Sequence, residues 1–234
     1  MPLKKPSTKF KSSTTTQASR GRYLTHQVFF PVIIFTLILW FLYRSLFNFP
    51  VWFDEIIGKA IFFGLPVWVY INVTGFRPII DSFMLKNLQS GMLKGLVIGG
   101  MFGFLTVFIR LLQTGGTVEP VLIFFADQFW WEMLWGLFTA FFETVFFFSF
   151  VMTVVQDRFI YWSLIKQVIL VTLIFMLFHI PNVFIRFDLV SVFPILSLLT
   201  LFAIGQSLLF AQKQNAYLLV TSHVIWGMAL LLYF

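Results

Sequence analysis

Apolar runs long enough to cross a bilayer dominate this chain, and short polar connections separate them. A spanning helix needs about 20 mostly apolar residues, and none of these runs alternates as barrel strands do. Seven such stretches cover about residues 28–47, 56–73, a Gly-rich stretch ending near 110, 133–155, a stretch from Trp162 to His179, 190–210 and 216–234. We therefore predict an all-α fold, a polytopic transmembrane helical bundle of about seven spans.

Composition agrees with this pattern and excludes a soluble domain. The chain is 59% hydrophobic and only 11% charged, and its mean hydropathy is +0.92, far outside the usual soluble range. It contains no cysteine. Disulfides, thiolate metal sites and a cysteine nucleophile are therefore excluded.

The net charge of +7 is concentrated where topology needs it. Six of the sixteen basic residues lie in the first 22 positions, in a segment without acidic residues. We expect residues 1–25 to be a disordered basic cytoplasmic tail, with an organellar transit peptide as the alternative. Residues 26–234 form the predicted bundle. Bilayer headgroups, and no nucleic acid, are the partners that the charge indicates.

One orientation fits every connection between the spans. With the basic tail inside, the basic connection from Arg77 to Lys94 and the residue Lys213 also fall inside. The acidic connection at Asp54 and Glu55 then falls outside. Seven spans put the N-terminus in the cytoplasm and the C-terminus outside. We expect an integral protein of a bacterial-type cell membrane.

Three further features concern packing and the interface. The third span carries small residues spaced for close helix packing at Gly95, Gly99, Gly100 and Gly103. Lys59 lies near the end of the second span and is expected to snorkel to the interface, with pairing to Asp54 or Glu55 as the alternative. The segment from Val121 to Trp131 is expected to be interfacial because Asp127, Gln128, Trp130 and Trp131 suit the headgroup level.

Three ionisable side chains lie well inside predicted spans: Glu143 in the fourth, His179 in the fifth and His223 in the seventh. A charged residue at a helix centre costs about 2.5–3.5 kcal/mol on insertion scales, so each needs a partner or a function. At about 1.5 Å per residue, the three reach a common depth zone. We expect them to meet.

The helix faces beside these residues support that expectation. On the fourth span Gly136, Thr139, Ala140 and Glu143 recur at spacings of three and four, and Glu132 extends this face outward. On the sixth span a similar stripe is formed by Ser197, Thr200, Ala203 and Ser207, with Gln206 beside it. The two stripes predict a polar cavity among spans four to seven.

Several chemistries fit one Glu and two His residues. Glu143 with one imidazole can act as a general base toward a trapped water, while the second imidazole polarises a carbonyl. The same three side chains match a zinc site with an open position, although no HExxH spacing is present. A Ser–His arrangement through Ser222 is disfavoured because adjacent helix residues point about 100° apart. A structural polar cluster and ion or proton transport remain alternatives.

The order of these residues resembles a known family. The type II CAAX-processing and bacteriocin-processing intramembrane proteases carry EExxxR in one span, FxxxH in the next and HxxxN two spans later. The corresponding segments here are Glu143–Phe148, Phe175–His179 and His223–Gly227. The resemblance covers about residues 131–234. The chain departs from the family pattern at Thr144, Phe148 and Gly227, which stand in place of the second Glu, the Arg and the Asn.

The resemblance implies an intramembrane endopeptidase that hydrolyses a peptide bond of a membrane-associated protein or peptide. Glu143 and His179 would activate the water and His223 would help to hold the oxyanion. The supporting residues would be Thr144, Phe175, Gln206 and Gly227, with Asn182 as a further source of polarity. The sequence identifies no definite cofactor, and a divalent metal such as zinc on the three central residues is the alternative. A catalytically inactive pseudoprotease, acting as a membrane scaffold or immunity-type binding protein, is the alternative function.

Overall fold

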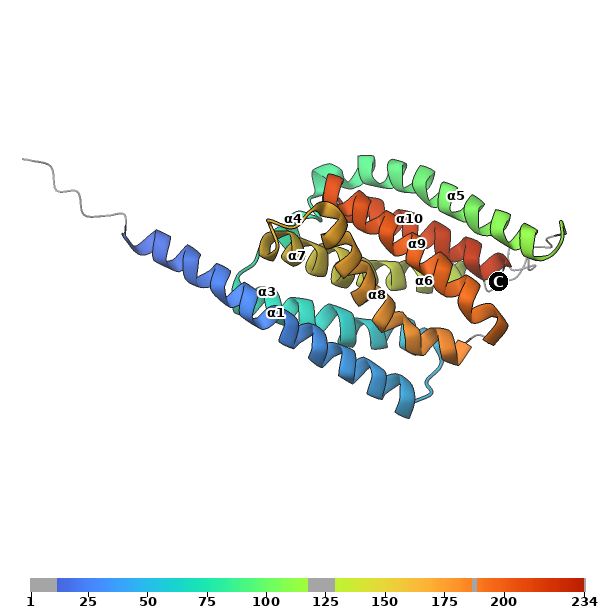
Figure 1. Cartoon of the computed structure of the whole chain (residues 1–234), viewed down its shortest axis with the longest axis horizontal. Coiled ribbons are helices and arrows are strands. Elements are labelled where there is room, and N and C mark those ends of the chain that lie inside the picture. The colour runs from blue at the N-terminus through green and yellow to red at the C-terminus, as the bar shows by residue number, and fades with distance from the viewer. Residues whose placement is uncertain (1–11, 118–128, 187–188, 234) are drawn as a thin grey trace, which may run out of the picture.

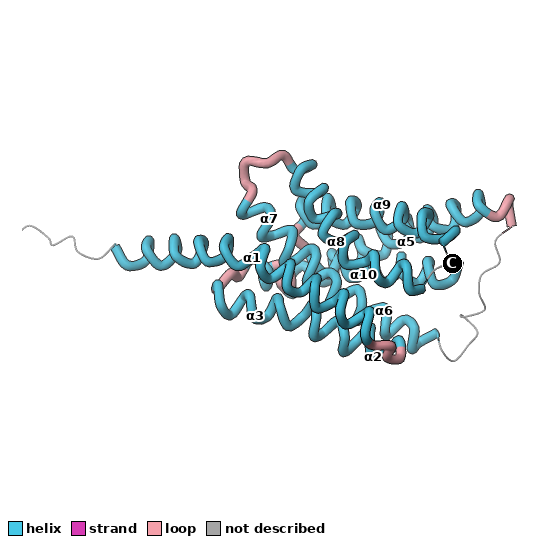
Figure 2. Tube along the Cα trace, turned by 60° about the horizontal axis from the view of Figure 1, so that its bottom comes forward, coloured by secondary structure: helices cyan, strands magenta, loops and turns pink. Residues whose placement is uncertain are grey.

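The computed structural model describes residues 12–117, 129–186 and 189–233, with side chains given from residue 27 onward except at 186–191 and 231–233. These ranges contain helices and turns but no strand (Figure 2). The first half comprises α1 (Ser12–Leu46), α2 (Val51–Phe53), the π-helical η1 (Asp54–Gly58) and η2 (Ala60–Gly64), α3 (Leu65–Thr74), α4 (Pro78–Asp81), the short 3₁₀ segment η3 (Leu85–Asn87) and α5 (Leu88–Gln113). The second half comprises α6 (Phe129–Glu143), the π-helical η5 (Thr144–Met152), α7 (Thr153–Arg158), α8 (Leu164–Arg186), α9 (Leu189–Lys213) and α10 (Ala216–Tyr233).

The prediction of an all-α bundle with about seven spans is confirmed. Within the described ranges six helices are long and apolar enough to cross a membrane: Gln27–Leu46, Val51–Thr74, Pro78–Gln113, Phe129–Arg158, Leu164–Ile185 and Val192–Lys213. A shorter apolar helix, Ala216–Leu230, adds the seventh. Three of the spans contain more than one element: η1 and η2 connect α2 to α3, η3 lies between α4 and α5, and η5 connects α6 to α7.

The first described helix begins well before its predicted start. The first helix begins at Ser12 and not near Val28, so it extends into the segment expected to be disordered. Adding a residue to an existing helix gains a hydrogen bond without the cost of nucleation, so a spanning helix continues readily into a polar flank. Most of the predicted interfacial segment, and residues 1–11 of the predicted tail, lie outside the described residues.

The span from Phe129 to Arg158 is the centre of the bundle. Its most apolar window is 72% buried, against 22–44% for the five other long spans. The remaining helices lie around it, with α1 and α3 on one side and α5, α9 and α10 on the other (Figure 1). A phenylalanine core surrounds its π-helical half. The ring centroids of Phe147 and Phe175 lie 4.9 Å apart and those of Phe146 and Phe178 lie 5.2 Å apart, and both pairs pack edge to face.

Glycine allows α5 and α10 to approach closely. A Cβ added at Gly95 would lie 2.6 Å from Thr221 Cβ and 2.7 Å from the Leu218 carbonyl oxygen, and Gly91 and Gly99 are as tight. Gly100 faces open space. The small-residue face therefore consists of Gly91, Gly95, Gly99 and Gly103, and the inclusion of Gly100 in the predicted face is wrong, because that position is turned about 100° from Gly99.

Polar contacts fix the position of α10 along the glycine face of α5. Asn215 Oδ1 accepts the backbone N–H of Tyr217 at 3.1 Å and so caps the helix, while Asn215 Nδ2 donates to the Asn87 carbonyl at 3.0 Å. Further along, Trp226 Nε1 donates to Thr106 Oγ1 at 2.9 Å. These contacts set the depth of His223, which lies between the two ends.

Candidate functional site

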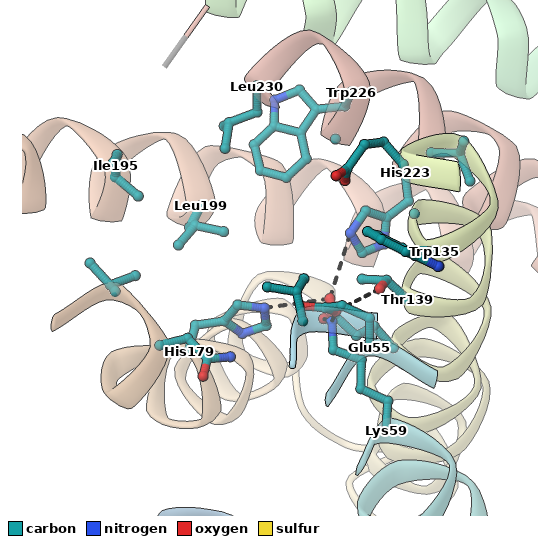
Figure 3. Close-up of a pocket in the computed structure, with 18 residues that line it drawn as sticks. Glu55, Lys59, Trp135, Thr139, His179, Ile195, Leu199, His223, Trp226 and Leu230 are labelled. Carbon is teal, nitrogen blue, oxygen red and sulfur yellow. Dashed lines mark hydrogen bonds and ion pairs between the residues drawn. The ribbon is translucent and has the colours of Figure 1, made fainter. Parts of the chain in front are cut away.

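Glu143, His179 and His223 come together as expected. The three residues come from α6, α8 and α10. The side chains of His179 and His223 point into a common space (Figure 3). His179 Nε2 lies 3.4 Å from Glu143 Oε2, and His223 Nε2 lies 3.5 Å from the same atom. Residues 36 to 80 positions apart in sequence therefore share a single oxygen.

The other oxygen of Glu143 binds a cation that the sequence reasoning misplaced. Lys59 Nζ lies 2.6 Å from Glu143 Oε1 and 2.5 Å from Glu55 Oε2, and Lys59 is only 4% exposed. The expectation that Lys59 snorkels to the interface is wrong, and the alternative of pairing with Glu55 is confirmed. Two carboxylates hold its ammonium inside the bundle, which offsets the cost of removing it from water.

Glu55 has a second partner on the central span. Thr139 Oγ1 donates to Glu55 Oε2 at 2.6 Å. The i,i+4 spacing of Glu55 and Lys59 favours their pairing on one helix face. The link to Glu143 spans 84 positions, and no local pattern could indicate it.

Both segments that carry these charges depart from the α-helix at the site. Lys59 lies between the π-helical η1 and η2, and Glu143 immediately precedes η5. π-Helical turns are rare and occur frequently at functional sites. Their wider turn changes which residues share a face, so the regular 3.6-residue spacing used for the prediction does not hold beyond Glu143.

The orientation of His179 follows from its own helix. Its Nδ1 lies 2.8 Å from the Phe175 carbonyl oxygen, which can only accept, so Nδ1 carries the proton. In the neutral ring, Nε2 then presents a lone pair toward the site. The ring stacks on the Phe175 ring at 3.9 Å with an interplanar angle of 18°. At the preceding residue, Trp40 Nε1 donates to the Phe178 carbonyl at 2.9 Å and holds α8 against α1.

The site opens into a cavity of about 260 Å³. This volume holds several water molecules at about 30 Å³ each, or a short stretch of peptide. Polar and ionisable side chains line it at Glu55, Lys59, Glu132, Thr139, Glu143, His179, Asn182 and His223, and apolar residues and glycines complete it at Val51, Trp135, Gly136, Val183, Ile195, Leu199, Val224, Trp226, Gly227 and Leu230. The second span therefore contributes to a cavity that was expected among spans four to seven.

The predicted polar stripe of the sixth span does not line this cavity, and that part of the prediction is wrong. The α9 residues at the cavity are Ile195 and Leu199. Thr200 donates to the Leu196 carbonyl at 2.7 Å and Ser197 donates to the Phe193 carbonyl at 2.9 Å. Hydroxyls in helices satisfy themselves on the preceding turn in this way, so their polarity does not require a cavity.

The predicted supporting residues have different surroundings. Gln206 Nε2 donates to Ser222 Oγ at 2.9 Å, and neither lines the cavity. Thr144 is fully buried and its hydroxyl has no hydrogen-bond partner among the described residues. Asn182 does line the cavity, and its Oδ1 has no partner within the described part of the chain. Asn182 is therefore the one of these three that can offer polarity to a ligand.

The departures from the family pattern are accommodated differently. Phe148 is fully buried, and its ring stacks on that of Phe175 with the ring centroids 6.1 Å apart. The apolar core therefore fills the position where the resemblance expects Arg. Gly227 lines the cavity, and a Cβ built there would meet nothing within 4 Å. Space for a larger side chain is therefore present at position 227.

A metal ion does not fit this arrangement. Across residues 12–117, 129–186 and 189–233, no three His, Cys, Asp or Glu side chains are grouped to hold one. The positive charge next to Glu143 is the ammonium of Lys59. The geometry instead suits acid–base chemistry, because Lys59 anchors Oε1 while Oε2 faces two imidazoles at distances longer than the usual 2.7–3.2 Å of a hydrogen bond.

Comparisons with models of known protein families, with curated proteins and with solved structures found no match to this chain.

Proposed function

We propose that this protein is an intramembrane endopeptidase that cleaves a peptide bond of a membrane-associated protein or peptide. The observation that carries the proposal is the meeting of Glu143 Oε2 with two imidazoles from different helices at the wall of a cavity inside the bundle. A bilayer makes such a cluster costly, so a chemical role is a better explanation than packing. The proposal includes a bacterial-type cell membrane and a cytoplasmic N-terminus, because the basic connections agree with that orientation.

The reaction uses the groups already in place. A water molecule beside Glu143 Oε2 gives a proton to the carboxylate as its oxygen bonds to the scissile carbonyl carbon, and the carbonyl oxygen becomes an oxyanion. His223 and Asn182 lie at the cavity wall to stabilise that charge. The C–N bond then breaks, and the proton passes from Glu143 to the leaving amine. Lys59 anchors Oε1, so Oε2 stays directed at the water.

Cleavage of membrane-anchored peptides by the purified protein in detergent tests this proposal. Replacing the general base, as in Glu143→Gln, should reduce the rate by about 10²–10⁴-fold. Asp81→Asn is the matched control, because Asp81 is an exposed carboxylate that does not line the cavity. Unchanged cleavage by Glu143→Gln would show that the proposed base is wrong.

A non-catalytic role is the second candidate, and two observations favour it. Lys59 already pairs with the carboxylate that would act as base, and Gly227 supplies no side chain where the resemblance expects a hydrogen-bond donor. Gly227→Asn separates the two candidates because the added side chain has room. If the site is a working protease, this change should raise the rate, by up to about 10²–10³-fold for a recovered oxyanion donor. A pseudoprotease would cleave no peptide before or after it.

A further inference from the structure

A second hollow adjoins the cavity at the amino-terminal end of the central span. It measures about 510 Å³ and is lined by Trp52, Ile56, Trp131, Glu132 and Trp135. Glu132 and Trp135 also line the cavity that contains Glu143, so the two spaces share a wall. We call this second space the tryptophan hollow. The two spaces are therefore neighbours along the central span.

The lining of the tryptophan hollow suits a positively charged group. Three indole rings and one carboxylate surround the space, and the faces of indole rings attract ammonium and guanidinium groups more strongly than other aromatic rings do. An aliphatic side chain, Ile56, can pack against the stem of a long basic side chain. Tryptophan also anchors helices at the interface, but anchoring does not require three rings around one hollow with an acid.

The charges along the adjoining cavity favour the same ligand. Its wall carries three carboxylates, at Glu55, Glu132 and Glu143, and one ammonium, at Lys59. Carboxylates therefore outnumber ammonium groups among these lining side chains. A cleft of one sign with low-dielectric walls concentrates ligands of the opposite sign.

We propose that the tryptophan hollow binds a lysine or arginine side chain of the peptide substrate and so sets the position of the cut. This inference rests on the proposed endopeptidase function and adds the substrate class. Eleven residues along α6 separate Glu132 from Glu143, which is about 16 Å at about 1.5 Å per residue. An extended peptide covers about 3.3 Å per residue, so the basic residue lies about four or five positions from the scissile bond.

A lysine scan of one cleaved peptide tests the position. A single Lys is moved along an otherwise uncharged membrane-anchored peptide, and KM and kcat are measured at each place. We expect the lowest KM with Lys four or five residues from the cut, and a rise of about tenfold with Gln there. Trp131→Leu should abolish that preference. Trp130→Leu is the matched control, because Trp130 immediately precedes Trp131, is similarly exposed and does not line the hollow. If KM does not depend on the position of Lys, the inference is overturned.

Binding to the Glu143→Gln variant separates this inference from the proposed function. In an uncharged maltoside detergent, the Lys peptide should bind about tenfold more tightly than the Gln peptide, and Trp131→Leu should remove the difference. Preferential binding without cleavage by the unmodified protein would leave the hollow assigned and refute the endopeptidase. Cleavage without preferential binding of the Lys peptide would support the endopeptidase and refute the assignment of the hollow. If dispersed short-chain phosphatidylcholine displaces the Lys peptide while phosphatidylglycerol does not, the hollow is a lipid-headgroup site and its assignment to the substrate is wrong.

Discussion

Replacing Lys59 by methionine should destabilise the protein more than almost any other single change to a charged residue. Methionine keeps the length and apolar stem of the side chain but removes the ammonium that joins Glu55 and Glu143. Lys59 and Glu143 are each 4% exposed and Glu55 is 8% exposed. Removing one partner of a buried ion pair costs about 3–5 kcal/mol, because it leaves an uncompensated charge in a medium of low dielectric constant.

Burial decides the size of this effect. An exposed ion pair contributes only about 0.2–1 kcal/mol, because water screens it and competes for its partners. Lys94→Met is therefore the matched control, since Lys94 is exposed on α5, and we expect a change below about 0.5 kcal/mol there. The free energies of unfolding of both variants can be measured by reversible denaturant titration in mixed micelles, followed by circular dichroism.

A double-variant cycle tests the reasoning directly. If the cost of Lys59→Met arises from the unpaired carboxylates, adding Glu143→Gln should recover part of it, and adding Glu55→Gln should recover more. Contacting residues in one network show coupling of about 0.5–3 kcal/mol, whereas independent sites add within about 0.3–0.5 kcal/mol. A loss below about 1 kcal/mol for Lys59→Met, or simple additivity with Glu143→Gln, would refute the buried network.

The same unfolding titration checks three further predictions. Gly95→Ala should cost about 1–2 kcal/mol. The added Cβ would lie 2.6 Å from Thr221 Cβ on α10, and this clash outweighs the roughly 0.5–1 kcal/mol that alanine gains over glycine in a helix. Gly100→Ala faces open space and should not destabilise the protein, so equal effects would contradict the assigned face. Thr106→Val should cost about 1–3 kcal/mol, since it leaves the buried Trp226 Nε1–H without its acceptor, and a neutral result would argue against that hydrogen bond. Thr144→Val should leave stability unchanged or raise it by up to about 1 kcal/mol, because the hydroxyl it removes is buried without a partner in the described structure; a clear loss would indicate a missing contact.

The residues of the candidate site divide clearly into those that sequence could find and those it could not. Glu143, His179 and His223 were identifiable because an ionisable group in an apolar span is conspicuous by its cost alone. Lys59 has the same cost, but it lies near acidic residues at a predicted span end, where a snorkelling lysine is the ordinary expectation. The α9 stripe was wrong for the opposite reason, since the hydroxyls of Ser197 and Thr200 bond to their own helix at Phe193 and Leu196.

The sequence by itself determined the helical class, the approximate spans and the three ionisable residues, because the bilayer imposes length and hydrogen-bonding requirements that can be read locally. The tertiary structure decided which atoms meet. It joined Lys59 to Glu143, placed the glycine face of α5 against α10 and brought two imidazoles to one carboxylate oxygen. It also put Trp52 of the second span beside Trp131 and Trp135 of the fourth. Contacts between distant segments depend on the rotation and depth of each helix, and the π-helical turns at Lys59 and Glu143 change that rotation in a way that a regular helical period does not describe.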